Sequence, residues 1–158
     1  MKKCIFSGVF DPPTKGHEKT VEKCLKIFDE VVIAVMVNPE KQPLLPSEQR
    51  TALLDKLFDG ESRVRVRTFY GAAADLLKEE NTPFYVRGVR NTLDFEYENS
   101  NNFASKKLNN DIITLYIPAE QEDLHISSSA VRTLVKFGKD YSEYVPAKIL
   151  QDLKKILG

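Results

Sequence analysis

Short apolar runs alternate with amphipathic stretches along this chain of 158 residues. The run at 31–37 is continuously apolar and mostly β-branched, which is typical of a strand buried on both faces of a parallel sheet. The run at 64–69 alternates between apolar and polar residues, so we expect that strand to lie near a sheet edge. The pattern predicts five strands in all, at residues 3–6, 31–37, 64–69, 84–86 and 112–117.

The stretches between these strands carry helical periodicity, and several have recognisable ends. Ser47 precedes a run with Glu48 in its first turn, and Ser127 or Ser128 precedes another, so we expect these serines to act as N-caps. Gly138 follows an apolar residue where a helix should stop. The expected helices are 17–28, 47–58, 72–80, 92–108, 128–137 and 147–157.

Alternation of strands and helices predicts one α/β domain over residues 1–158. We expect a Rossmann-like, doubly wound, five-stranded parallel sheet with helices on both faces. Ligands of such folds bind outside the carboxyl ends of the strands. The chain segments that follow the first, second, fourth and fifth strands are therefore the places to look for chemistry.

Composition limits the classes of partner. Lys+Arg and Asp+Glu both number 23, giving a formal net charge of +0, so neither nucleic acid nor an anionic membrane surface is an expected partner. No apolar run approaches the ~20 residues of a membrane span, and the N-terminal apolar run is too short for a signal peptide. We expect a cytoplasmic protein. Cys4 and Cys24 are expected to be reduced packing residues, without a zinc site.

The segment from Gly8 to His17 joins the first strand to the first helix through a Gly/Pro-rich turn. Free backbone N–H groups at a helix N-terminus favour an anion. His17 is in the first turn, where a ring nitrogen can reach the same anion. A glycine turn followed by a surface histidine is the plain alternative for this segment on its own.

Three further segments carry polar groups suited to phosphate. Lys41 follows the second strand, and an ammonium can bridge two phosphates, although a loop lysine is often simply solvated. Arg87-Gly88-Val89-Arg90 ends the fourth strand, with two guanidinium forks around a glycine. Three serines at 127–129 follow the fifth strand, and N-capping of the next helix alone would not need three hydroxyls. Their common position favours a nucleotide-phosphate site.

The order of these motifs resembles a known family. Thr14-Lys15-Gly16-His17 matches the T-x-G-H signature of a nucleotidyltransferase superfamily, inside G-x-F-D-P-x-T-x-G-H. R-G-x-R from Arg87, then D-F-E-Y-E from Asp94 and I-S-S-S from Ile126, resemble the phosphopantetheine adenylyltransferases. The resemblance spans essentially the whole chain.

This resemblance implies transfer of the adenylyl group of ATP to 4'-phosphopantetheine, which yields dephospho-coenzyme A and pyrophosphate, the penultimate step of coenzyme A synthesis. It also implies Mg²⁺, bound mainly through the ATP phosphates and not by protein ligands, and a homohexamer. ATP, 4'-phosphopantetheine and dephospho-coenzyme A or coenzyme A are the implied ligands.

The resemblance also implies roles for individual residues. The implied catalytic residues are His17, Lys41, Arg90 and Ser128. The implied ATP contacts are Val9, Phe10, Thr14, Gly16, His17, Gly88, Val89, Arg90, Glu98, Asp123, Leu124, His125, Ile126, Ser127, Ser128 and Ser129. The implied phosphopantetheine contacts are Val9, Lys41, Ala73 and Arg87.

The chain departs from the family pattern at three places. Val9 replaces the usual Thr or Ser, Ser7 replaces a common Pro, and residues 122–125 lack an aromatic residue often found before I-S-S. Two rival functions remain open at this level. One is another nucleotidyltransferase of the superfamily, acting on nicotinamide mononucleotide or glycerol phosphate. The other is a module that senses ATP or coenzyme A without chemistry.

Overall fold

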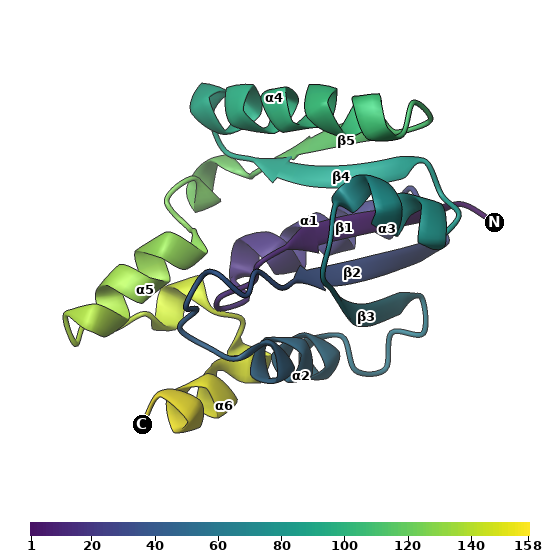
Figure 1. The fold of residues 1–158 in the computed structure, drawn as a ribbon. Helices are drawn as coiled ribbons and strands as arrows, with labels where there is room; N and C mark the ends of the chain where they lie inside the picture. The colour runs from purple at the N-terminus through teal and green to yellow at the C-terminus, as the bar shows by residue number, and fades with distance from the viewer.

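A computed structural model describes all 158 residues and shows the expected α/β architecture (Figure 1). Five parallel strands form one sheet in the order β3-β2-β1-β4-β5. The strands are β1 (Lys3–Gly8), β2 (Glu30–Met36), β3 (Val64–Phe69), β4 (Phe84–Val89) and β5 (Ile113–Pro118). The predicted fold class is therefore confirmed, and the alternating strand β3 does lie at an edge.

Six α-helices and two short 3-10 turns connect and follow the strands. The helices are α1 (Lys15–Cys24), α2 (Ser47–Leu57), α3 (Ala73–Glu79), α4 (Thr92–Leu108), α5 (Ser128–Lys136) and α6 (Ala147–Leu157). The 3-10 turns η1 (Gln121–Asp123) and η2 (Ser142–Tyr144) precede α5 and α6. All of these helices are too short or too polar to cross a bilayer.

Helices cover both faces of the sheet, as the sequence predicted. On one face, α1 and α2 pack side chains such as Val21 and Leu54 against Phe6 and Ile33. On the other face, Leu76 and Leu77 of α3 pack against Ile5 and Val32 (Figure 1). β1 and β2 are buried between these layers, which explains the continuous apolar run of β2 from Val31 to Met36.

A third apolar cluster joins the C-terminal part of the chain to α2. Leu53 and Leu57 of α2 pack with Val131 of α5 and with Ile149 and Leu153 of α6. This cluster fixes α5 beside the carboxyl ends of the central strands (Figure 1). The start of α5 therefore lies near the turn that precedes α1, where the Ser128 hydroxyl contacts Pro12.

Some predicted boundaries were wrong for identifiable reasons. Ser47 is the first helical residue after Pro46 and makes no capping hydrogen bond. α1 begins earlier than predicted because Thr14 caps it. β4 continues to Val89 because Arg87, Gly88 and Val89 pair with β5, and ladder pairing does not require apolar side chains. Ser127 and Gly138 do mark the ends of α5 as predicted.

Candidate active site

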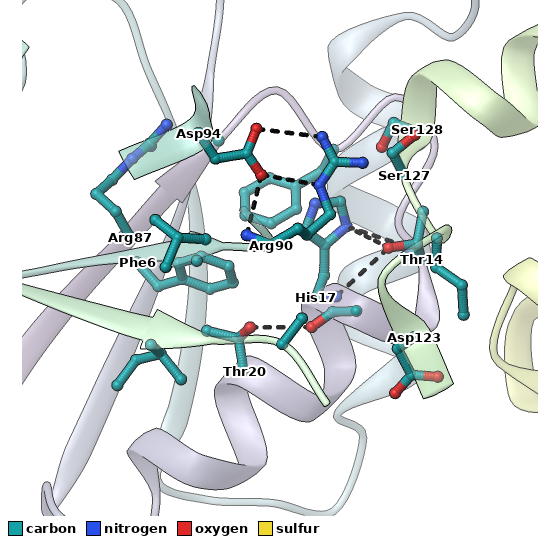
Figure 2. A pocket seen from close by; sticks show the side chains of 18 of the residues that line it. Phe6, Thr14, His17, Thr20, Arg87, Arg90, Asp94, Asp123, Ser127 and Ser128 are labelled. Carbon is teal, nitrogen blue, oxygen red and sulfur yellow. Dashed lines mark hydrogen bonds and ion pairs between the residues drawn. The ribbon is translucent and has the colours of Figure 1, made fainter. Parts of the chain in front are cut away.

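The turn between β1 and α1 holds His17 in one orientation. The Nδ1 atom of His17 accepts the backbone N–H of Thr14 at 3.0 Å, and the Thr14 hydroxyl accepts the backbone N–H of His17 at 3.4 Å. This reciprocal capping box leaves the N–H groups of Lys15 and Gly16 without protein acceptors at the helix start. Because Nδ1 is an acceptor, the proton of the neutral ring is on Nε2. Figure 2 shows Thr14 and His17 in contact at the helix start.

The surroundings of His17 favour its neutral form. Burial of the ring, followed by the positive charges of Arg87 and Arg90, lowers the pKa of His17 from 6.5 to about 4. Phe10 packs edge-on against the imidazole, with ring centroids 4.7 Å apart. At neutral pH His17 is thus an uncharged donor placed among positive charges.

Two buried side chains brace the turn that carries this histidine. Asp11 accepts the backbone N–H groups of Leu44 and Leu45 at 2.8 and 2.9 Å. Arg50 donates to the carbonyls of Leu45 and Val9 at 3.0 and 2.8 Å. The backbone of the turn is constrained from α2 and from the segment before it. Such bracing sustains the positive φ of 54° at Phe10, an unusual value for a bulky residue.

Each arginine at the end of β4 pairs with a carboxylate of α4. Arg87 forms a bidentate pair with Glu98, with N–O distances of 2.7 and 2.8 Å. Arg90 pairs with Asp94, whose carboxylate also accepts the Arg90 backbone N–H at 3.0 Å. The Nη1 group of Arg90 has no protein acceptor and remains available to a ligand.

The start of α5 and the η1 turn form the opposite wall. The Ser127 side chain accepts the N–H of Ala130 at 3.0 Å, so this hydroxyl is an N-cap. The Ser128 hydroxyl donates to the carbonyl of Pro12 at 2.7 Å. The buried Asp123 forms an ion pair with Lys19 of α1, which ties the η1 turn to that helix.

These elements enclose a cavity of about 310 Å³, which we call the His17 cavity (Figure 2). Its lining joins three segments that are far apart in the sequence: residues 6–20, 87–98 and 117–128. The predicted site residues that line it are Val9, Phe10, Thr14, Gly16, His17, Arg87, Gly88, Val89, Arg90, Glu98, Asp123, Ile126, Ser127 and Ser128. No group of three or more His, Cys, Asp or Glu side chains in the structure could hold a metal ion.

Five predicted residues lie outside the lining of this cavity. Lys41 is exposed in the turn after β2, and Ala73 is in the first turn of α3. Leu124 and His125 are exposed because the η1 turn directs Asp123 and Ile126 inward instead. His125 packs edge-on against Tyr144, with ring centroids 5.3 Å apart. Ser129 is exposed on α5.

Several residues that support the site were not predicted from the sequence. Arg50 gave no signal, since a buried arginine within a helix looks like any surface arginine in a periodic pattern. Arg132 donates to the carbonyl of Asp11 at 2.8 Å. Its position, four residues after Ser128 and one turn further along α5, could have indicated that it faces the same turn.

A second cavity of about 360 Å³ adjoins the first, and we call it the α4 cavity because Tyr97, Asn101 and Ser105 of α4 line it. The two cavities share Ser7, Gly8, Val9, Arg87 and Glu98. Val9, which is 51% exposed, therefore faces both spaces without a hydroxyl. The arrangement suits a ligand pair whose charged groups meet near Arg87.

Comparisons with known proteins agree with this arrangement. Residues 5–134 match the Cytidylyltransferase-like family. A phosphopantetheine adenylyltransferase of Streptococcus pneumoniae is 38% identical over 151 residues, covering 95% of this chain and 93% of that protein. The enzyme of the same name from Clostridium beijerinckii is 36% identical, covering 97% and 96%.

A solved structure supports the same fold. A Vibrio parahaemolyticus protein, assigned as a nicotinate-nucleotide adenylyltransferase, superposes with a TM-score of 0.71 at 25% identity, covering 99% of this chain and 95% of that one. The chain is more similar in sequence to the proteins of S. pneumoniae and C. beijerinckii, at 38% and 36% identity over nearly the full length, than to that neighbour at 25%. The chain belongs to the Cytidylyltransferase-like family and, within it, to the phosphopantetheine adenylyltransferases.

Proposed function

We propose that this protein transfers the adenylyl group of ATP to 4'-phosphopantetheine and releases pyrophosphate and dephospho-coenzyme A. The observation that carries the proposal is the His17 cavity, where a helix N-terminus, a neutral histidine and two arginines converge. The phosphate of the acceptor has a second pKa of about 6, so it is already a nucleophile at neutral pH. Catalysis then needs positioning and charge stabilisation, without a protein base.

We assign His17 to the α-phosphate. Its Nε2–H is the free donor of the ring, and the N–H groups of Lys15 and Gly16 lie in the same helix turn. The negative charge on the α-phosphate oxygens grows as the acceptor phosphate attacks. A donor placed for that charge contributes about 2.7–4 kcal/mol to lowering the barrier. His17→Ala should therefore lower kcat by about 100- to 1000-fold.

Arg90 and the start of α5 are assigned to the leaving pyrophosphate. The free Nη1 group of Arg90 can donate to a phosphate oxygen while Asp94 holds the other edge of the guanidinium. The Ser128 hydroxyl already donates to Pro12, so we expect the helix N–H groups to contribute more than that hydroxyl. Loss of Arg90 should raise the KM for ATP.

Mg²⁺ is proposed to enter with ATP. The carboxylates that line the His17 cavity each pair with a basic side chain, as is the case for Asp94, Glu98 and Asp123. The chain therefore offers no free acidic cluster for a resident ion, which agrees with a metal carried by the substrate phosphates. Bound there, the ion would neutralise the charge of the leaving pyrophosphate.

The acceptor phosphate is assigned to Arg87 and Lys41. Arg87 lies where the two cavities meet, and Lys41 is exposed in the turn after β2. A long, flexible ammonium side chain can approach two phosphates once both substrates are bound. Lys41→Ala should lower kcat more than it raises the KM for either substrate, because the contact forms only in the assembled complex.

The proposed assembly is a homohexamer in the cytoplasm. In the single chain α4 buries no residue and exposes Leu93, Tyr97 and Phe103, which leaves an apolar surface that subunit contacts would cover. A hexamer of 18.0-kDa chains would have a mass of about 108 kDa by light scattering. A monomeric mass would contradict this part of the proposal.

Pyrophosphate release from MgATP tests the function, with 4'-phosphopantetheine, nicotinate mononucleotide, nicotinamide mononucleotide and glycerol 3-phosphate compared in parallel. We expect release only with phosphopantetheine, and its loss in His17→Ala. Release with another acceptor would keep adenylyl transfer as the reaction and change the assigned acceptor substrate. Binding of ATP without release for any acceptor would favour a nucleotide sensor.

A further inference from the structure

Arg87 stands at the junction of the His17 cavity and the α4 cavity. It is the one basic side chain among the residues that line both spaces. Burial alone would lower the pKa of Arg87, but hydrogen bonds and charge from Glu98 raise it, so the guanidinium is always charged. Its orientation therefore decides where a fixed positive charge faces a ligand.

Almost all hydrogen-bond donors of Arg87 are committed. Nε and Nη2 donate to Glu98, while Nη1 donates to the carbonyl and hydroxyl oxygens of Ser7 at 2.7 and 2.9 Å. A guanidinium has five N–H donors. Only one N–H, on Nη2, is therefore left for a ligand unless Glu98 releases its edge.

Two hydroxyl groups hold the opposite edge of this guanidinium. The Ser7 and Tyr85 hydroxyls are 2.5 Å apart, and the Tyr85 hydroxyl is 3.5 Å from Nη1 of Arg87. Tyr85 and Arg87 are two residues apart on β4, so they point to the same face of the sheet. The Arg87 guanidinium also lies 5.7 Å from the Tyr85 ring centroid.

We infer that Ser7 and Tyr85 are positioning residues that fix the plane of the Arg87 guanidinium at the junction of the two cavities. The Glu98 edge can exchange its carboxylate for a phosphate, whereas the Ser7 edge stays bound to the sheet. Arg87 then meets a phosphate in an orientation set before the ligand arrives. The identity of that phosphate as phosphopantetheine rests on the proposed function; the fixed orientation does not.

Four variants test the role by kinetics. Ser7→Ala and Tyr85→Phe each remove one hydroxyl, the double variant removes both, and Tyr116→Phe is the matched control. Tyr116 faces Arg87 across the β4–β5 ladder, but its hydroxyl bonds to Asn99 at 3.3 Å instead. We expect each single variant to raise the KM for phosphopantetheine about tenfold, with the KM for ATP and kcat within about twofold.

The KM of the double variant for phosphopantetheine should be about equal to that of the single variant with the higher KM, because both hydroxyls act through one guanidinium. Tyr116→Phe should leave both KM values unchanged. Equal increases in both KM values, or no change in the KM for phosphopantetheine in either single variant, would overturn the positioning role.

A spectroscopic measurement reads the orientation without turnover. The Nε–H resonance of Arg87, identified by its loss in Arg87→Lys, should be sharp in the ¹⁵N spectrum of the wild type. It should shift or broaden in Ser7→Ala and Tyr85→Phe and stay unchanged in Tyr116→Phe. An unchanged resonance in both hydroxyl variants would overturn the inference. Absence of wild-type turnover with phosphopantetheine would instead refute the proposed function and leave this readout decisive.

Discussion

Replacing His17 with asparagine tests whether the imidazole is held neutral by its surroundings. The Asn side-chain oxygen can still accept the N–H of Thr14, as Nδ1 does in the wild type, but the side chain cannot titrate. A pKa that falls from 6.5 in the unfolded chain to about 4 in the folded chain corresponds to about 3 kcal/mol. Folding with a charged His17 therefore costs about that much.

The sign follows from proton counting. Between pH 4 and 6.5 the unfolded chain binds more protons at this position than the folded chain does, so the free energy of unfolding rises with pH across that window. From pH 7 to pH 5 the wild type should lose about 2 kcal/mol more stability than His17→Asn, and from pH 7 to pH 4 about 3 kcal/mol more. Other groups titrate alike in both proteins and cancel in the difference.

Urea unfolding followed by circular dichroism suits the measurement, since the chain has no tryptophan. A proton titration by NMR gives the pKa directly, and His125 is the only other histidine to be distinguished. Parallel stability curves for the two proteins, or a pKa for His17 near 6.5, would refute the reasoning that burial and the two arginines keep the ring neutral.

Three further outcomes follow from the contacts described above or from the sequence. Hydrogen bonds from Arg65 outweigh the effect of burial and, with those from Arg67, lower the pKa of the buried Glu80 carboxylate to about 2. The ionised Glu80 carboxylate therefore stabilises the fold fully above pH 4.5, and this contribution is lost as the pH falls through 2. Glu80→Gln should therefore lower the free energy of unfolding at pH 7 by about 2 kcal/mol, and an unchanged urea midpoint would contradict this. Arg50→Met should leave buried carbonyls unpaired, lowering the unfolding free energy by about 2–3 kcal/mol and loosening the turn before α1, which amide exchange at Thr14 would report. Val9→Thr should lower the KM for phosphopantetheine several-fold by adding a hydroxyl at the junction of the cavities, and an increased KM would show that the methyl group of Val9 is needed there.

The fold was largely predictable because its signals are periodic. The apolar run at 31–37 identified β2, and Ser127 identified the start of α5, since each acts through its own neighbours in the sequence. Ser47 failed because Pro46 begins the helix without any side-chain cap. The end of β4 was predicted too early, because its last residues are held by backbone pairing with β5, and the polarity of the sequence does not reveal that pairing.

The same distinction applies to the residues of the candidate site. Residues within contiguous motifs, such as His17 and Arg90, were found because spacing and position along a strand or helix end are visible in the sequence. Ser7, Tyr85 and Arg50 act through partners on other elements, and one sequence carries no trace of such pairings. His125 lies outside the lining of the His17 cavity, because the η1 turn just before it buries Asp123 against Lys19, and the sequence does not show which side chains such a turn directs inward.

The bracing of the β1–α1 turn has a consequence for transplanting this site. The backbone from Val9 to Thr14 keeps its shape through Arg50 in α2, Arg132 in α5 and the Asp11 contacts to the chain before α2. The G-x-F-D-P-x-T-x-G-H segment therefore does not hold its conformation by itself. Grafting it onto another scaffold, or exchanging α2 between relatives, would need both arginines to travel with it, so recombination breakpoints between residues 9 and 132 should be the least tolerated in chimeric libraries.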